Sequence, residues 1–325
     1  MIILRRDHAT LLPSLPDTVV AGMHHAPIPA RRMLDLALQA GACFVDAGHV
    51  QQPAEAMQAV ATALKGRGDA VLVMGTVPTQ ADAAQATDRS IARHLQVQVD
   101  TLLRQLGRPC LDVLVLQGWP VAGVPMETLV LAVDALMRAG RIRYWGVSGF
   151  AAWQLASAVH AARALRMHTP VLQQVRYTPV ARLAECELLP AGRQLGVAAV
   201  VMSPACRAAA WMPSPSPALR AQRQALGWLQ PQANDEELAW EAIHVLEGIA
   251  AAHGASASQV AMAWLRGAPG VSTVAACVAD EPELVASLSP SLRLDDHARA
   301  RIDTLLPPAA VLARITPRLV ADGRP

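Results

Sequence analysis

Eight short apolar runs recur along the chain, and a longer amphipathic stretch separates each run from the next. Runs that are apolar throughout are typical of parallel strands buried on both faces. The expected strands cover residues 18–22, 43–46, 70–76, 111–117, 143–148, 170–174, 198–203 and 271–277. Eight alternations of strand and helix predict an α/β fold, a (β/α)₈ TIM barrel that forms a single domain over residues 1–325.

Helical periodicity fills the intervals between the apolar runs. It is clearest over residues 30–40, 54–65, 88–106, 126–139, 151–165 and 183–195. Gly107, Gly140 and Gly196 follow three of these stretches, where glycine commonly ends a helix. Ser256 is a candidate N-cap of a later helix. Residues 206–234 are rich in Pro, Ser, Arg and Trp, which predicts a long loop after strand seven, over the barrel mouth.

Composition excludes several classes of partner. Hydrophobic residues make up 53% of the 325 residues and charged residues 17%, so a large core is expected. The net charge of +2 argues against nucleic acid and against an anionic membrane surface. No apolar run reaches about 18 residues, and no signal peptide is recognisable. Five scattered cysteines without a C-x-x-C pair favour a reduced, cytoplasmic protein, and the Ala, Arg and Leu bias suggests a bacterial one.

Five segments match the motifs of one enzyme family. They are residues 44–51 (FVDAGHVQ), 129–150 (LVLAVDALMRAGRIRYWGVSGF), 174–178 (QVRYT), 187–204 (ELLP followed by MSP) and 253–265 (HGASASQVAMAWL). Through these segments the chain resembles the aldo-keto reductase family over most of its length. The resemblance implies an aldo-keto reductase-like barrel, with the reacting groups at the carboxyl ends of the strands.

The resemblance also implies where the family's catalytic tetrad should lie. In the family a tyrosine donates a proton, a lysine and a histidine tune that tyrosine, and an aspartate pairs with the lysine. Asp46 matches the aspartate, whereas Gln51, Thr76 and Gln117 stand at the tyrosine, lysine and histidine positions. Glutamine and threonine cannot donate a proton near neutral pH. The chain is therefore predicted to be a divergent member with a lost catalytic tetrad.

The positions that hold the nicotinamide cofactor in the family have changed as well. Gly149 replaces an asparagine, and Met202 replaces the aromatic residue that stacks on the nicotinamide ring. Ser148 and Gln174 match the family, but the late arginine that would hold the adenosine part is missing. On this basis we expect no cofactor, with NADP retained only if the chain is a divergent reductase.

The leading functional prediction is a non-redox biosynthetic enzyme, a lyase, isomerase or cyclase of natural product biosynthesis, that binds a hydrophobic small molecule. Asp46 is the expected acid or base, because a semi-buried carboxylate without a cation has a raised pKa. The competing reading is that Asp46 only caps a backbone turn. His49 is a candidate catalytic partner of Asp46, and Gln51, Thr76 and Gln117 are candidate polar groups that orient the substrate.

Further residues are expected to bind the substrate around the barrel mouth. These candidates are His24, His25, Trp119, Ser148, Gln174, Met202 and Trp211. Tryptophan and methionine suit an apolar pocket, and histidine suits a proton shuttle. No spacing typical of a metal site occurs, so no metal is expected. Two alternatives stay open, a divergent NADPH-dependent oxidoreductase and a non-catalytic binding or scaffold protein, and the oligomeric state is not predicted.

Overall fold

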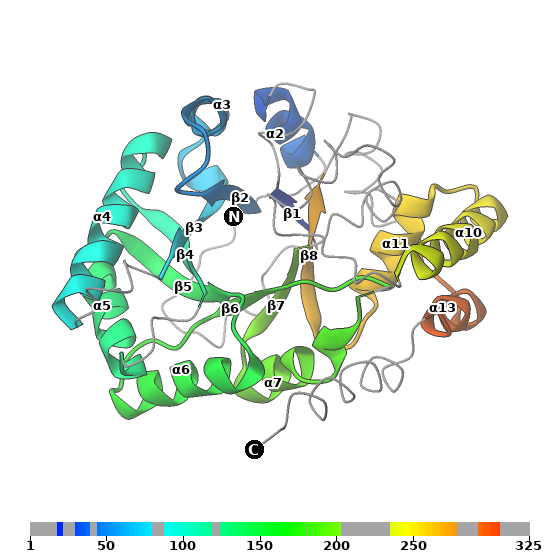
Figure 1. Cartoon of the computed structure of the whole chain (residues 1–325). Coiled ribbons are helices and arrows are strands. Elements are labelled where there is room, and N and C mark those ends of the chain that lie inside the picture. Colours follow the sequence, from blue (N-terminus) through cyan, green and yellow to red (C-terminus); the bar gives the residue numbers. More distant parts are fainter. Residues whose placement is uncertain are drawn as a thin grey trace, which may run out of the picture.

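The computed structural model describes residues 18–21, 30–39, 44–79, 88–118, 124–179, 181–202, 235–277 and 292–305. Eight strands are hydrogen-bonded in chain order into a closed barrel (Figure 1). All neighbouring strands are parallel, including the closing pair of the first and last strands. The strands are β1 (Thr18–Ala21), β2 (Phe44–His49), β3 (Leu72–Pro78), β4 (Leu111–Gln117), β5 (Ile142–Ser148), β6 (Leu172–Val175), β7 (Ala198–Met202) and β8 (Val271–Cys277). The barrel expected from the eight apolar runs is therefore present.

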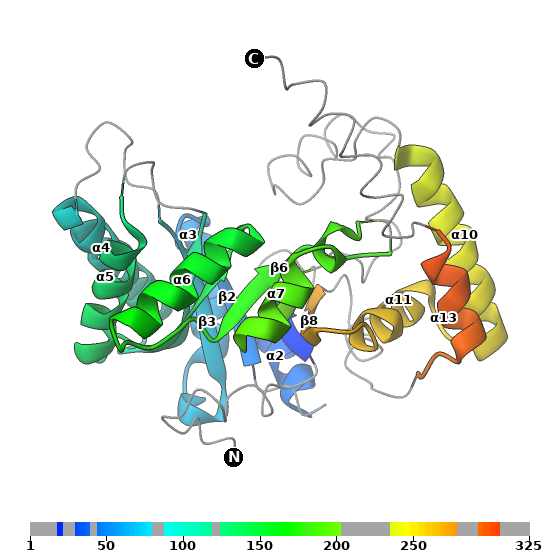
Figure 2. The ribbon, with the colours of Figure 1, turned by 90° about the horizontal axis from the view of Figure 1, so that it is seen from below.

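Helices follow the strands and surround the barrel (Figure 1). They are α2 (Ala30–Gln39), α3 (Ala54–Leu64), α4 (Asp88–Leu106), α5 (Met126–Arg138), α6 (Ala152–Ala164), α7 (Leu188–Leu195), α10 (Asp235–His253), α11 (Ala257–Arg266) and α13 (Asp296–Asp303), with short 3-10 turns η2 (Gly68–Ala70) and η4 (Leu183–Glu185). The C-terminal helices α10, α11 and α13 lie together at one side of the barrel (Figure 2). No described helix is long and apolar enough to cross a membrane.

Most predicted boundaries agree with the structure to within a few residues, and β4 and β8 agree at both ends. Strand β2 runs three residues further than expected, because a register shift after Asp46 lets His49 pair with Thr76. The predicted helix over residues 183–195 is interrupted, since η4 ends before α7 begins. Helices α10 and α13 were not predicted. The predicted loop over residues 206–234 lies outside the described residues.

The predicted helix termini, three C-terminal glycines and one N-cap serine, are confirmed. Gly107, Gly140 and Gly196 all have positive φ, which glycine adopts without a steric penalty. Ser256 accepts a hydrogen bond from the Gln259 backbone N–H at 3.2 Å, and the Gln259 side chain accepts one from the Ser256 backbone N–H at 2.8 Å. This reciprocal capping box starts α11.

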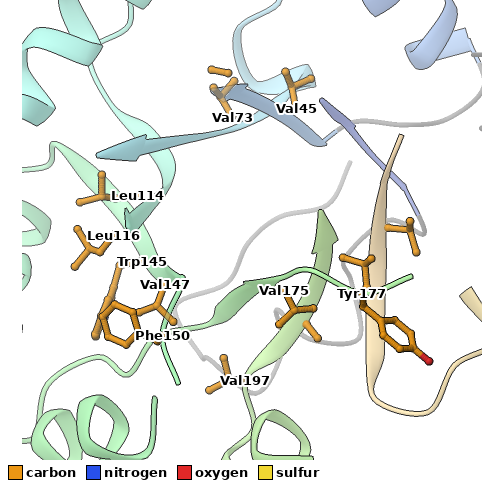
Figure 3. Packing of buried hydrophobic residues seen from close by; sticks show 14 of the residues in the cluster. Val45, Val73, Leu114, Leu116, Trp145, Val147, Phe150, Val175, Tyr177 and Val197 are labelled. Carbon is orange, nitrogen blue, oxygen red and sulfur yellow. The ribbon is translucent and has the colours of Figure 1, made fainter. Parts of the chain in front are cut away.

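Alternate residues of each strand divide the core into two layers. The outward faces pack under the helices, as the side chains of Val45, Val73, Leu114, Trp145 and Val175 do (Figure 3). The inward faces form a separate cluster within the barrel, with members Phe44, Leu72, Met74, Val113, Val115, Tyr144, Val171, Leu172, Ala198, Val200, Met202 and Ala275. Because side chains alternate along a strand, residues two places beyond an inward member also face the interior, nearer the carboxyl ends.

A buried polar network ties the segment after β6 to the C-terminal helices. Arg182 donates two hydrogen bonds to Glu185, at 2.8 and 2.9 Å, and a third to the Asp303 backbone carbonyl at 2.8 Å. Its guanidinium also lies over the Trp264 ring, 5.4 Å from the ring centroid. Trp264 Nε1 in turn donates to Asp303 Oδ1 at 2.9 Å, and the Tyr177 hydroxyl donates to Glu185. These contacts join three separate chain segments at one place, which are residues 177–185, α11 and α13.

Candidate functional site

A group of polar and sulfur-containing side chains gathers at or near the carboxyl ends of the strands. We call this group the barrel mouth; it comprises Asp46, His49, Thr76, Gln117, Ser148, Gln174 and Met202. The strand register brings several of them together, because Gln117 pairs with Ser148 and Ser148 pairs with Gln174. The carboxyl ends of the strands are where barrel enzymes place their chemistry.

Asp46 is the buried ionisable group of the barrel mouth, with 8% of its surface exposed. Its Oδ1 accepts a hydrogen bond from the Gly48 backbone N–H at 2.8 Å. Its Oδ2 accepts from Gln174 Nε2 at 3.5 Å, which reaches it from β6, the strand opposite β2 in the barrel. Burial raises the Asp46 pKa to about 6, and the two hydrogen bonds lower it in part. The carboxyl therefore changes charge close to neutral pH, as an acid-base group does.

Gly48 holds Asp46 through its backbone, and the position requires glycine. Its φ is 91°, in the left-handed region. A Cβ built there would lie 2.4 Å from the side-chain nitrogen of Gln52. An alanine at this position would therefore need the Gln52 side chain to shift.

We expect Gly48→Ala to lower both stability and activity. The positive φ is strained for alanine, which costs about 1 to 3 kcal/mol, and the Cβ also forces the Gln52 side chain to shift. The matched control is Gly66→Ala, since Gly66 has φ 79° but nothing within 4 Å of the added Cβ. Urea denaturation should show a larger loss for Gly48→Ala than for Gly66→Ala. Equal losses would mean that the Gln52 contact is unimportant.

His49 is held in one neutral form. Its Nδ1 accepts a hydrogen bond from the Gln51 backbone N–H at 3.1 Å, so the ring proton lies on Nε2. Burial lowers the His49 pKa, and a hydrogen bond to the Gln117 side chain opposes that shift. A hydrogen bond raises the His49 pKa when the ring donates and Gln117 accepts, because such a bond favours the charged ring. The Gln117 side-chain carbonyl therefore accepts from His49 Nε2–H. The structure therefore brings His49 and Gln117 together as a neutral pair.

The other predicted site residues differ in burial, and four of them lie outside the described residues. Thr76 is buried at 6% exposure, and its carbonyl accepts from the Val50 N–H at 3.0 Å. Met202 is buried in the inner cluster, and Ser148 is half-buried. The Gln51 side chain is exposed, so its described contact with His49 is through the backbone. The remaining substrate candidates, which are His24, His25, Trp119 and Trp211, lie outside the described residues.

Sequence reasoning missed three residues that shape the barrel mouth. Met74 Sδ lies 3.8 Å from Gln174 Nε2, and Met74 pairs with Asp46 in the strand register. Fully buried Thr79 holds the end of β4, since its Oγ1 donates to the carbonyl of Gly118 at 2.5 Å. Gly48 is the third. Met74 lies two residues before Thr76 on the same strand, so the alternation of side chains along a strand would have identified it. The roles of Thr79 and Gly48 depend on a hydrogen bond to the backbone and on a positive φ, which the sequence does not show.

The described residues contain no group of three or more His, Cys, Asp or Glu placed to hold a metal ion. A groove of about 380 Å³ lies between α4 and α5, outside the barrel, and is lined by Ala92, Gln96, Asp100, Ala132, Ala135, Leu136, Ala139 and Arg141. None of these residues belongs to the barrel mouth. The chemistry available to the described site therefore comes from Asp46 and the neutral polar groups around it.

The chain is similar to known proteins along most of its length. The sequence profile of the Aldo/keto reductase family matches residues 26–307. A putative voltage-gated potassium channel subunit beta of Schizosaccharomyces pombe is 30% identical over 188 residues, which are 56% of this chain and 54% of that protein. The uncharacterized oxidoreductase YrpG of Bacillus subtilis is 38% identical over 80 residues, 25% of this chain and 24% of that protein. The matches thus span about half and a quarter of these two relatives.

Two solved structures share the fold. A thermostable aldo-keto reductase, Tm1743, solved with the inhibitor epalrestat, has a TM-score of 0.65 at 21% identity and covers 90% of this chain and 94% of its own. An aldo/keto reductase from Klebsiella pneumoniae, solved with NADP and acetate, has a TM-score of 0.65 at 22% identity and covers 90% and 92%.

The prediction of no cofactor is contradicted, because the family profile matches residues 26–307 and an aldo/keto reductase of the same fold was solved with NADP. That prediction relied on the replaced residues Gly149 and Met202 and on the missing late arginine, although Ser148 and Gln174 match the family. The two retained residues are register partners at the barrel mouth.

Proposed function

Because the chain belongs to the aldo/keto reductase family, we propose that it is an NADP(H)-dependent oxidoreductase whose proton-transferring group is the Asp46 carboxyl. The observation that carries this proposal is the state of Asp46, buried in the barrel mouth with a pKa of about 6. The positions of the family's other three catalytic residues hold Gln51, Thr76 and Gln117, which do not exchange protons near neutral pH.

The residues at the barrel mouth fit the nicotinamide end of the cofactor. Ser148 and Gln174 offer a hydroxyl and a carboxamide from neighbouring strands, and both are half-buried. Gln174 is held loosely, by contacts of 3.5 Å to Asp46 and 3.8 Å to Met74, so its amide can turn towards a ligand carboxamide. Met202 offers an apolar wall. When bound, NADPH supplies a hydride.

The Asp46 carboxyl then donates or accepts the proton of the reaction. Below about pH 6 the protonated Asp46 carboxyl donates to the atom that gains negative charge during reduction. Above that pH its carboxylate accepts a proton, which suits the reverse oxidation. His49 stays neutral, because burial lowers its pKa. In this role His49 and Gln117 orient polar groups and carry no net charge.

The earlier prediction of a non-redox lyase, isomerase or cyclase gains no support from the family or from the similar proteins. Those proteins are described as two aldo-keto reductases, an oxidoreductase and a channel subunit. The channel subunit match covers only about half of each chain, so we propose no assembly with a channel. An oxidoreductase is therefore the better proposal.

Titration of the protein with NADPH, followed by nucleotide fluorescence, tests the proposal directly. We expect a dissociation constant in the low micromolar range. Gln174→Leu should weaken binding by about tenfold, the usual effect of one lost hydrogen bond. Gln96→Leu on the exposed face of α4 makes the same chemical change outside the site and should leave binding unchanged. Absence of binding at about 1 mM would rule out the proposed function.

The pH dependence provides a second test. The kcat/KM for reduction of a neutral substrate, which needs a proton from Asp46, is expected to fall by about tenfold per pH unit above about pH 6, because the protonated fraction of Asp46 falls in that proportion. Oxidation in the reverse direction should rise up to the same pH and then level off. The inflection should vanish in Asp46→Asn. If that variant keeps the same inflection, a different group titrates.

A further inference from the structure

We infer that the substrate's reducible group is a carbon–nitrogen double bond, bound as an iminium cation against the Asp46 carboxylate. This inference rests on the proposed oxidoreductase function and names its substrate class. It assigns the barrel mouth a preference for cyclic imines and iminium ions over ketones and aldehydes of similar shape.

The first argument is that Asp46 has neutral partners. Its carboxyl oxygens accept from a backbone N–H and from a side-chain amide, at Gly48 and Gln174. None of the ion pairs found in the described part of the chain includes Asp46. A buried carboxylate whose described partners are all neutral is the electrostatic complement of a cationic ligand.

The second argument is that the groups facing Asp46 do not repel a cation. Among the described side chains these groups are Met74, its register partner on β3, and Gln174 on β6. His49, on the same strand, is kept neutral by burial, which lowers its pKa. The pKa of Asp46 is raised by its own burial, and the part of the chain that the structure describes adds no charge to the causes. A bound cation would reverse part of that shift and would be held more tightly in return.

The third argument is chemical. Reduction of a carbonyl leaves an alkoxide that needs a proton, and only about one tenth of Asp46 carries a proton at pH 7 if its pKa is about 6. An iminium ion already carries its positive charge, so no proton donor is needed during reduction. Gln51, Thr76 and Gln117 can therefore be neutral without loss of this reaction.

The reaction balances without a further reagent. The iminium carbon gains a hydride, the π pair of the carbon–nitrogen bond becomes the nitrogen lone pair, and NADPH becomes NADP⁺. A neutral imine first takes the proton from the Asp46 carboxylic acid, which solvent later restores. The net change is imine, NADPH and one proton to amine and NADP⁺.

The recognition of charge can be measured without cofactor. Calorimetry at about pH 8 compares the permanent cation N-methyl-3,4-dihydroisoquinolinium with neutral 1-tetralone, which has a similar shape. We expect the cation to bind at least about tenfold more tightly to the native protein, as an opposite charge near a buried carboxylate should. Asp46→Asn should remove this preference. Asp296→Asn on the exposed surface of α13 removes the same charge and should preserve it.

Turnover with NADPH completes the test. We expect 3,4-dihydroisoquinoline to be reduced with a kcat/KM at least about a hundredfold above that of 1-tetralone. Equal binding of the two probes, or faster reduction of the ketone, would overturn the inference while leaving the oxidoreductase in place. Preference for the cation without NADPH binding would overturn the oxidoreductase and, with it, the imine reduction, but would keep cation recognition by Asp46.

Discussion

Asp46→Asn is expected to stabilise the fold at neutral pH while it lowers turnover by about a hundredfold or more, the usual scale for an acid-base group. The stabilisation follows from the Asp46 pKa, which rises from 3.8 to about 6 on folding. Between these values the folded protein holds a proton that the unfolded chain has released. Stability therefore falls as pH rises through this window, and above it the buried carboxylate costs on the order of 2 to 3 kcal/mol.

Thermal and urea denaturation of both proteins from about pH 4 to pH 8 measure this effect. Asparagine has nearly the same shape as aspartate but cannot ionise. The gain in stability should be near its maximum at about pH 8 and should vanish near pH 4. A variant that is less stable than the native protein at about pH 8 would mean that a cationic partner compensates the Asp46 charge.

Arg182→Ala is expected to be among the most destabilising single changes, at about 3 to 5 kcal/mol. The Arg182 side chain is only 7% exposed, and it bonds both Glu185 and the Asp303 backbone. Its removal leaves the Glu185 carboxylate partly buried without its cation and also removes packing on Trp264.

Arg138→Ala is the matched control for this change. Arg138 pairs with Asp134 one helical turn away on α5, but its side chain is 73% exposed. Loss of such a surface pair should cost less than about 1 kcal/mol. Urea denaturation of both variants at neutral pH makes the comparison. A cost below about 1 kcal/mol for Arg182→Ala would contradict the view that this network anchors the C-terminal helices.

Much of the scaffold could be predicted because its signals are local. The apolar runs placed β4 and β8 at their observed ends, and Gly196 marked the end of α7 by its positive φ. Asp46 was singled out because it matches the aspartate of the aldo-keto reductase tetrad, at the end of a predicted strand. The interruption between η4 and α7 could not be predicted, since it accompanies contacts of Arg182 with the distant residues Trp264 and Asp303.

The sequence by itself determined the barrel, because hydrophobic period is a local property, and its resemblance to a family directed attention to Asp46. Only the tertiary structure decided the state of that group. Gln174 lies 128 residues from Asp46 and reaches it from the opposite strand of the closed barrel. The Asp46 pKa depends on burial by many strands together, and the His49 ring proton depends on its contacts with Gln51 and Gln117. Such quantities arise from three-dimensional proximity, which barrel closure creates.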